Sequence, residues 1–88
     1  VFILPSALDN VVESNFSIYP NPATNSISIN ANESIVRIDI YDIKGSLIFS
    51  QFYQKKKTSI DVSDFAKGVY AVKVVSMNNS SVQQLIIE

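Results

Sequence analysis

The stretch IVRIDIYDIKG, residues 35–45, carries the two signals on which our fold prediction depends. Its first part alternates in polarity, with three apolar side chains on one face: Val36, Ile38 and Ile40. The opposite face holds Arg37 and Asp39, as expected of a β-strand that buries one side. The remainder, Asp42–Gly45, has the composition of a hairpin turn, because its glycine can adopt a positive φ. The stretch therefore predicts a half-buried strand that enters a hairpin.

The same period of two recurs along most of the chain, which indicates further strands of the same kind. They are expected at Phe16–Tyr19, Ser26–Asn30, Ser46–Tyr53, Thr58–Val62, Val69–Ser76 and Ser81–Ile87. Turn-forming segments separate these runs at intervals of roughly 9–13 residues, the spacing typical of an all-β sandwich or barrel. No segment shows a sustained helical period. We therefore predict an all-β fold of about seven strands.

The alternation also predicts which side chains point into the core. Outside the first stretch, the expected inward residues are Ile27, Ile29, Leu47, Phe49, Ile60, Val62, Tyr70, Val72, Val74, Leu85 and Ile87. Between the strands we expect turns at Asn30–Asn32 and Met77–Ser80, and a polar loop at Gln54–Lys57. Ser63–Gly68 is expected to form a single helical turn, with its first serine as the N-terminal cap and its glycine closing it.

The segment IYPNPATNSISI, residues 18–29, places two of the three prolines of the chain around one asparagine. Pro20 and Pro22 each lack a backbone donor and hold φ near one value, so a strand that ends at Tyr19 cannot continue through them. Each proline also disfavours helix at the residue before it, Tyr19 or Asn21. We therefore expect a rigid corner from which the next strand emerges.

Composition narrows the classes of function. The chain has 88 residues, enough for one small domain, and 47% of them are hydrophobic. Its net charge of −1 gives no reason to expect a nucleic acid or an anionic membrane as partner, and no apolar run approaches the roughly 18 residues of a transmembrane segment. The absence of cysteine and histidine removes the commonest general base and the commonest metal ligands. We therefore expect no metal, no cofactor and no catalytic activity.

Val1–Asn15 differs from the rest of the chain. It starts with a short apolar run that meets Pro5 and continues as a polar-rich stretch without a clear period. We expect this segment to be a linker or the tail of a preceding domain, since poorly ordered segments are common at such positions. Because the sequence starts with valine and not methionine, we expect a fragment or a processed product of a longer protein. The folded domain is then expected to span residues 16–88.

Acidic side chains occur in two pairs that could carry chemistry. Asp39 with Asp42, and Asp61 with Asp64, could serve a hydrolase or bind calcium if they converged in a cleft. Aspartates beside turns more often accept hydrogen bonds from the turn backbone. We expect that structural role for Asp42 and Asp64.

Lysines and tyrosines also invite a functional interpretation. Lys55–Lys57 could bind phosphate or an anionic polysaccharide. We favour instead a solvated hairpin loop, whose charges discourage pairing at a sheet edge. The four tyrosines could line a sugar-stacking platform, but each lies in or beside a predicted strand, where packing is the commoner role. They are Tyr19, Tyr41, Tyr53 and Tyr70. No serine has a histidine to activate it, so the residues indicate a small all-β domain without catalytic apparatus.

Four blocks of the sequence, in this order and spacing, resemble a known family. They are FSIYPNPA (Phe16–Ala23) with the following SISI, then IVRIDIYDIKG (Ile35–Gly45), SIDVSDFAKGVYAVKV (Ser59–Val74) and a short apolar C-terminal strand. Together they strongly resemble the type A C-terminal sorting domain of the type IX (Por) secretion system of Bacteroidetes. The resemblance implies an Ig-like antiparallel β-sandwich of about seven strands, in agreement with the number of strands that the alternation predicts.

The resemblance implies a secretion signal fused to an upstream cargo protein. Such domains direct their cargo from the periplasm across the outer membrane through the type IX secretion translocon, so that the cargo is secreted or displayed at the cell surface. A sortase-like peptidase of the outer membrane then removes the domain. The expected cleavage region lies just before the folded domain, in Ser6–Asn15, of which we single out Ser6, Ala7, Leu8, Asp9 and Asn10.

The resemblance also implies which residues the translocon contacts. The expected recognition residues are Gly68, Val69, Tyr70, Lys73, Leu85, Ile86 and Ile87, and the N-terminal motif of the domain is Tyr19, Pro20, Asn21 and Pro22. Many family members end in a lysine-bearing strand, whereas this chain has Gln83 and Gln84 and ends at Glu88. A contact between the translocon and basic side chains of that strand is therefore in doubt here.

An Ig-like module for carbohydrate binding or adhesion is the alternative function. It predicts an aromatic platform or a metal site on one sheet face. For the secretion signal, the last strand suggests a means of recognition, because an end strand such as Ser81–Ile87 can present unpaired backbone groups. A receptor could add a strand there, and we hypothesise that the receptor recognises the signal by pairing with this edge.

Overall fold

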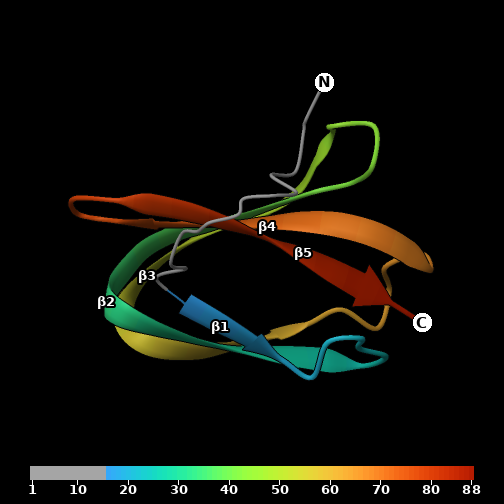
Figure 1. Ribbon diagram of the computed structural model, residues 1–88, viewed down its shortest axis with the longest axis horizontal. Helices are drawn as coiled ribbons and strands as arrows, with labels where there is room; N and C mark the ends of the chain where they lie inside the picture. Colours follow the sequence, from blue (N-terminus) through green and yellow to red (C-terminus); the bar gives the residue numbers. More distant parts are fainter. Residues whose placement is uncertain (1–15) are drawn as a thin grey trace, which may run out of the picture.

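A computed structural model describes residues 16–88 of the chain. Within them, five antiparallel strands form one strongly curled sheet (Figure 1). The strands are β1 (Phe16–Tyr19), β2 (Ser26–Tyr41), β3 (Leu47–Asp61), β4 (Gly68–Ser76) and β5 (Ser80–Ile87). The prediction of an antiparallel all-β fold is therefore confirmed.

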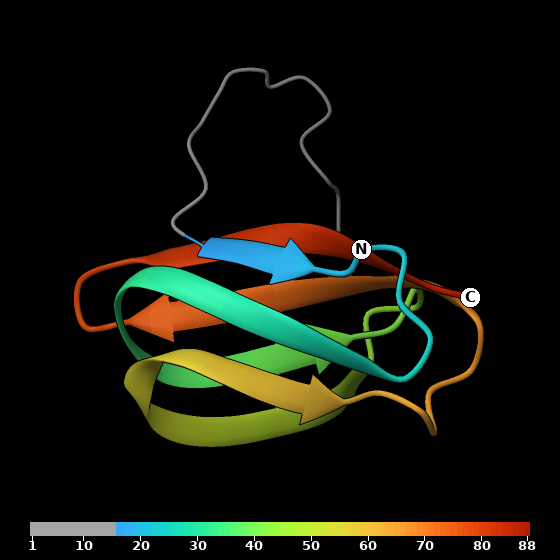
Figure 2. The ribbon, with the colours of Figure 1, turned by 90° about the horizontal axis from the view of Figure 1, so that it is seen from below.

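Two long strands, β2 and β3, belong to both layers of the fold. Residues 28–31 of β2 pair with β1 on one side, and residues 26–30 pair with residues 57–61 of β3 on the other. Residues 35–41 of β2 pair with β4 and with the first part of β3, and β5 continues this layer beyond β4. Figures 1 and 2 show β2 and β3 curving from one layer into the other. The curled sheet thus encloses its core as the predicted sandwich would.

The strand count is five and not the predicted seven, because two expected interruptions lie inside strands. The predicted turn at residues 30–32 is part of β2, and the predicted loop at residues 54–57 is part of β3. The β2–β3 register shifts between Asn30 and Ile35, which marks a β-bulge or similar irregularity. Such an irregularity bends and twists a strand while pairing resumes beyond it. Each long strand therefore replaces two of the predicted strands.

The core is built largely from the side chains that the alternation indicates. The predicted inward residues that are buried are Ile27, Ile29, Ile38, Ile40, Ile60, Val62, Tyr70, Val72, Val74, Leu85 and Ile87. Phe49 is half-buried and packs against them. Because these residues come from β2, β3, β4, β5 and the segment after β3, the core ties both layers together.

Three positions near the bulges differ from the prediction. Ile35 is fully buried in place of Val36, since the register shifts between Ile35 and Arg37 and changes which side chain faces inward. Leu47 is 53% exposed, and a second register shift lies beside it. Asp39, expected on the solvent face, is only 4% exposed. An extra residue changes which side chain faces inward, which explains the exchange of Ile35 for Val36. Asp39 keeps its outward position between the buried Ile38 and Ile40, but it is covered there because β3 and β4 flank it on both sides and its carboxylate contacts Ser50 and Arg37.

Aspartate side chains organise the turn between β2 and β3 and the segment between β3 and β4. Asp42 accepts hydrogen bonds at Oδ1 from the backbone N–H groups of Lys44 and Ser46, each 2.9 Å long, and Gly45 has a φ of +87°. This confirms the predicted hairpin turn. The segment after β3 forms turns and not the expected helical turn. There the accepting carboxylate is Asp61, which bonds Ser63 twice and so takes the role predicted for Asp64.

Candidate functional site

The residues that we expect the translocon to contact lie on two neighbouring strands, β4 and β5. The antiparallel register pairs six of them directly: Gly68 with Ile87, Val69 with Ile86, and Tyr70 with Leu85. We call these six residues the β4–β5 ladder. The seventh, Lys73, lies further along β4 opposite Val82. Two blocks that are separate in the sequence are therefore adjacent in the structure.

The inward side chains of the ladder belong to the core. Tyr70, Leu85 and Ile87 are all buried. The Tyr70 ring lies 5.5 Å, centroid to centroid, from the ring of Phe65, and its hydroxyl donates a hydrogen bond to the carbonyl of Ala66. A partner cannot touch these side chains in the folded protein, so their contribution is to hold the ladder in place.

The outward side chains of the ladder remain accessible in part. Val69 and Ile86 are both half-buried and, as a direct antiparallel pair, project from the same face of the sheet. Lys73 is also half-buried and lies on that face, since it is an even number of residues from Val69 along the strand. A partner that contacts the ladder from outside therefore meets two apolar side chains with a lysine nearby.

The proline corner (residues 20–23) is hydrogen-bonded to β5. The side chain of Asn21 donates from Nδ2 to the carbonyl of Gln84 over 2.9 Å and accepts at Oδ1 from the N–H of Ile86 over 3.0 Å. Ala23 then continues the contact through its backbone, since its N–H donates to Ile86 O and its carbonyl accepts from Glu88 N–H, each over 2.8 Å. Both neighbouring prolines lack a backbone N–H. The asparagine amide therefore takes the place of a strand residue at this edge.

This contact changes our expectation for β5. The hypothesis of an open edge along β5 is wrong for its C-terminal half, because Gln84, Ile86 and Glu88 already use backbone groups there to bind the corner. Gln83 also donates from its side chain to the carbonyl of Phe16 in β1. The structure thus joins the N-terminal motif and the C-terminal strand into one closed seam, which we call the β1–β5 seam.

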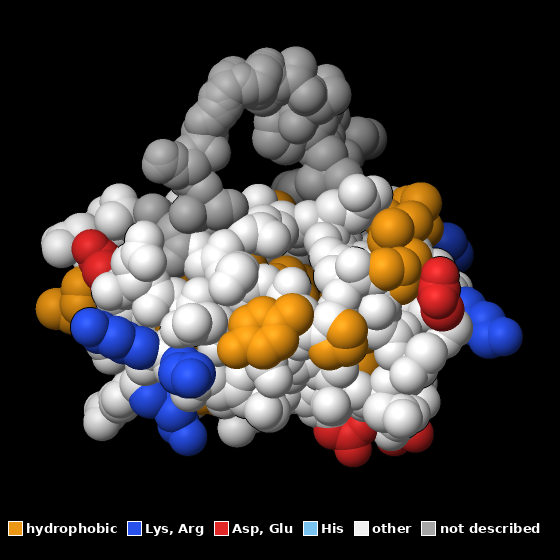
Figure 3. All heavy atoms as spheres, turned by 60° about the horizontal axis from the view of Figure 1, so that its bottom comes forward, with side chains coloured by type: hydrophobic (Ala, Val, Ile, Leu, Met, Phe, Trp, Pro, Cys, Tyr) orange, Lys and Arg blue, Asp and Glu red, His pale blue; other side chains and the backbone are white. Residues whose placement is uncertain are grey.

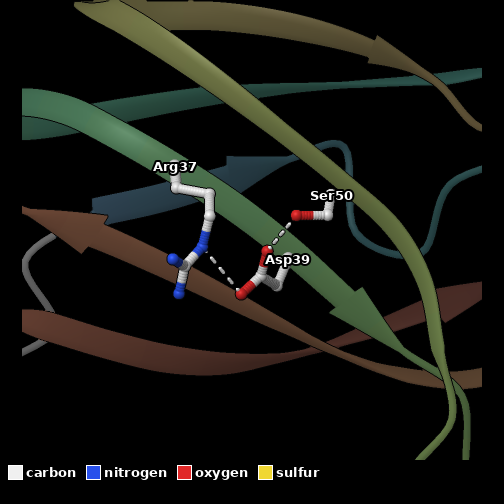
Figure 4. Close-up of polar contacts among 3 residues, drawn as sticks. All are labelled: Arg37, Asp39 and Ser50. Carbon is white, nitrogen blue, oxygen red and sulfur yellow. Dashed lines mark hydrogen bonds and ion pairs between the residues drawn. The ribbon is translucent and has the colours of Figure 1, made fainter.

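A polar cluster lies where β2 pairs with β3 (Figure 4), and its Asp39 is directly opposite Lys73 of β4 in the register. The buried carboxylate of Asp39 accepts a hydrogen bond from Ser50 Oγ over 2.6 Å and contacts Arg37 Nε over 3.1 Å. Ser50 and Asp39 are directly opposite each other in the register. The cluster therefore fastens the first part of β3 to β2, a role for Asp39 that alternation alone did not indicate.

The lysines and tyrosines do not assemble into a platform. The lysine triplet (residues 55–57) lies in β3 with every side chain exposed, and not in a hairpin loop. Tyr70 is buried, Tyr53 packs against the core and Tyr41 is half-buried at the end of β2, while Tyr19 is 46% exposed on β1. On the face shown in Figure 3, hydrophobic side chains form separate small groups with polar atoms between them. The platform required by the carbohydrate-binding alternative is therefore not formed by these four tyrosines.

Residues 16–88 contain neither a cluster of metal-binding side chains nor a membrane-spanning helix. No group of three or more histidine, cysteine, aspartate or glutamate side chains gathers there in a way that could hold a metal ion. The same part of the chain contains no helix that could cross a membrane. The expected cleavage residues, Ser6–Asn10, lie outside the described residues.

Comparisons with known proteins indicate where this architecture occurs. The sequence model of a family described as the secretion system C-terminal sorting domain matches residues 17–88. An endo-acting ulvan lyase of Formosa agariphila is 28% identical over 79 residues, which are 88% of this chain and 15% of that enzyme. A solved chain from a study of PorZ, a surface component of the type IX secretion system of Porphyromonas gingivalis, has a TM-score of 0.70 at 21% identity. The match covers 83% of this chain and 11% of that one, and it shows a shared fold.

Proposed function

The chain belongs to the family of secretion system C-terminal sorting domains, and we propose that it presents the outward face of the β4–β5 ladder to the secretion translocon. The domain is a secretion signal of the type IX secretion system, which delivers proteins through the outer membrane to the cell surface or the medium. We propose which residues of this signal the translocon contacts. It rests on the register that pairs Val69 directly with Ile86.

The structure supports a rigid recognition surface. The buried partners Tyr70 and Leu85 hold the ladder from below, and the β1–β5 seam holds its outer strand from the side. A surface that is already ordered loses little conformational entropy on binding, which favours affinity. The translocon would therefore recognise a folded domain through Val69, Ile86 and Lys73, and not an unfolded tail.

Export of a fused reporter tests this proposal. We expect Val69→Asp or Ile86→Asp to lower surface display by about tenfold, the change that follows the loss of one well-packed apolar contact at an interface. Val75→Asp is a matched control, because Val75 is also a half-buried valine of β4 on the same face but lies outside the ladder. Circular dichroism of the purified variants checks that they are folded. Equal export by folded Val69→Asp and Val75→Asp variants would contradict the proposal.

We propose further that residues 1–15 link this domain to a larger cargo, from which a sortase-like peptidase separates it within residues 6–15. The ulvan lyase supports a large cargo, because the segment similar to this chain makes up only 15% of that enzyme. Mass spectrometry of the exported reporter measures its new C-terminus. A terminus within residues 6–15 supports the proposal, whereas surface reporter that still carries the intact domain argues against it.

The domain itself is proposed to be non-catalytic. The sequence has no cysteine or histidine, and three of the four aspartates that suggested chemistry have structural partners. Asp42 and Asp61 accept turn hydrogen bonds, and Asp39 joins β2 to β3. In this proposal, any activity of the exported protein resides in the cargo.

A further inference from the structure

The outer edge of β3 contrasts with the closed β1–β5 seam. Within residues 16–88, β3 pairs only with β2, and it does so in both layers. Figure 2 shows β3, coloured yellow-green to yellow, as the lowest strand of the view with no described strand beyond it. At 15 residues it is a long edge strand, and an edge strand offers a row of unpaired backbone groups to another chain.

The first half of β3 lacks the usual protection of such an edge. Residues 47–54 contain no charged side chain, and three of their large apolar side chains are exposed: Leu47 by 53%, Ile48 by 41% and Phe52 by 71%. Natural edge strands commonly carry lysines that prevent pairing with other chains. Here the lysine triplet protects only the second half. We call the unprotected part, residues 47–54, the open edge.

The open edge is fixed in position and lies beside a surface hollow. Ser50 lies between Leu47 and Phe52 and is hydrogen-bonded to the buried carboxylate of Asp39 (Figure 4). The hollow next to Phe52 is also lined by apolar atoms of Val36, Tyr53 and Met77, among others. A strand added at this edge would therefore find ordered backbone groups on one side and apolar side chains on its face.

We propose that the open edge binds an extended segment of a partner protein by antiparallel strand addition, and that this segment carries acidic residues N-terminal to its apolar ones. Antiparallel pairing matches every strand pair of the sheet. It places the N-terminal end of the added strand beside the lysine triplet, where acidic side chains find opposite charge. The added backbone supplies affinity, and its alternate side chains contact Leu47 and Phe52.

A second copy of this chain is a poor occupant of the same edge. Residues 43–57 contain no aspartate or glutamate and four lysines. Antiparallel pairing of two copies about the middle of the open edge would bring the lysine triplet of each copy next to the turn that carries Lys44 of the other. Like charges placed together oppose association. The charge pattern therefore favours a different, acidic partner strand.

This inference is independent of the proposed export surface. The open edge belongs to β3, which is paired with neither β4 nor β5, and it contains none of the ladder residues. A variant that affects one surface is therefore expected to leave the other unchanged.

Peptide binding to the full chain tests the inference. The probe is a fluorescent synthetic peptide of about ten residues, with an acidic N-terminal third followed by alternating threonine and valine. We expect fluorescence anisotropy to show saturable binding, and Phe52→Lys to weaken it by about tenfold. Ile43→Lys is the control, because Ile43 is even more exposed but lies in the turn before β3. Equal losses in both variants would overturn the inference.

Further measurements identify the occupant and its direction. A peptide with the same residues in reverse order should bind more weakly, and equal binding of the two peptides would overturn the antiparallel arrangement. A Lys55→Glu/Lys57→Glu variant of the chain should also bind the original peptide more weakly.

Sedimentation of the chain alone should show a monomer. A dimer that Phe52→Lys abolishes would instead identify a second copy of the chain as the occupant. Likewise, Phe2→Asp/Leu4→Asp should leave probe affinity unchanged. Tighter binding by that variant would identify residues 1–4 as the occupant.

Discussion

The two edges of the sheet are treated in opposite ways. At the β1–β5 seam, Asn21 and Ala23 bind the backbone of β5 and of Glu88, the residue after it, through four hydrogen bonds. At β3, the described part of the chain supplies no partner on the outer side, and Phe52 is exposed. The difference shows that an edge strand can be closed by a side-chain amide as well as by another strand. The β1–β5 seam therefore stabilises the fold, whereas the outer edge of β3 is accessible to another chain.

The largest expected effect comes from the core beneath the seam. Leu85 is fully buried on β5, whereas Phe52 is 71% exposed on β3. We expect Leu85→Ala to lower the free energy of unfolding by about 2–5 kcal/mol, since it removes buried methyl groups and leaves a cavity. Phe52→Ala should change it by less than about 0.5 kcal/mol. Urea denaturation measures both, and similar losses would show that the two edges are equally well packed.

The next largest effect concerns the cluster that holds the open edge in place. Removing the Asp39 carboxylate deprives Ser50 and Arg37 of their shared acceptor. We expect Asp39→Ala to cost about 1.5–3 kcal/mol, the range for hydrogen bonds to a charged group. Ser50→Ala should cost less, about 1 kcal/mol, because the Arg37 contact remains. If Asp39→Ala were neutral, the anchoring role of this cluster would be refuted.

A smaller loss is expected from opening the seam itself. Asn21→Ala removes two hydrogen bonds to β5, and each contributes about 0.5–1.5 kcal/mol in a folded protein. Because the contact is exposed, we expect a total near the lower end, about 1–2 kcal/mol. Asn25→Ala is the control, since the contact of Asn25 with Val62 uses its backbone carbonyl. Thermal unfolding compares the two, and equal melting temperatures would mean that the Asn21 amide does not close the edge.

The smallest effect is expected at the open edge. Phe52→Lys replaces an exposed side chain and extends the charge of the lysine triplet along β3. We expect the free energy of unfolding to change by less than about 0.5 kcal/mol, while solubility at high concentration rises. Urea denaturation and light scattering measure these two properties. A loss as large as that of Leu85→Ala would show that Phe52 packs as a core residue.

The fold could be predicted from sequence where local pattern decides it. Period-two alternation identified the buried faces of β4 and β5 because nothing interrupts their pairing. In β2 and β3 it identified most of the buried side chains, but the extent of the strands was predicted wrongly, because residues 30–32 and 54–57 have turn-like composition and yet lie inside strands. Polar and small residues suit a turn and a bulge equally. Which of the two forms depends on pairing partners far along the chain.

In the candidate site, too, the sequence predicted local contacts but not contacts between residues far apart in the chain. The hairpin turn at Asp42 was predictable because its partners are at most four residues away. The role of Asn21 was not, since its partners Gln84 and Ile86 lie 63 and 65 residues further along the chain. An asparagine between two prolines did signal an unusual corner. Only the folded arrangement shows that this amide substitutes for a missing strand.

Amide hydrogen exchange of the full chain tests the contrast between the two edges most directly. The N–H groups of Ala23, Ile86 and Glu88 all donate within the seam, so we predict slow exchange there and fast exchange at the outward-directed amides of the open edge. In Asn21→Ala, exchange at Ile86 should become fast while the open edge stays unchanged. Exchange at Ile86 that is as fast in the unaltered chain as at the open edge would contradict the account.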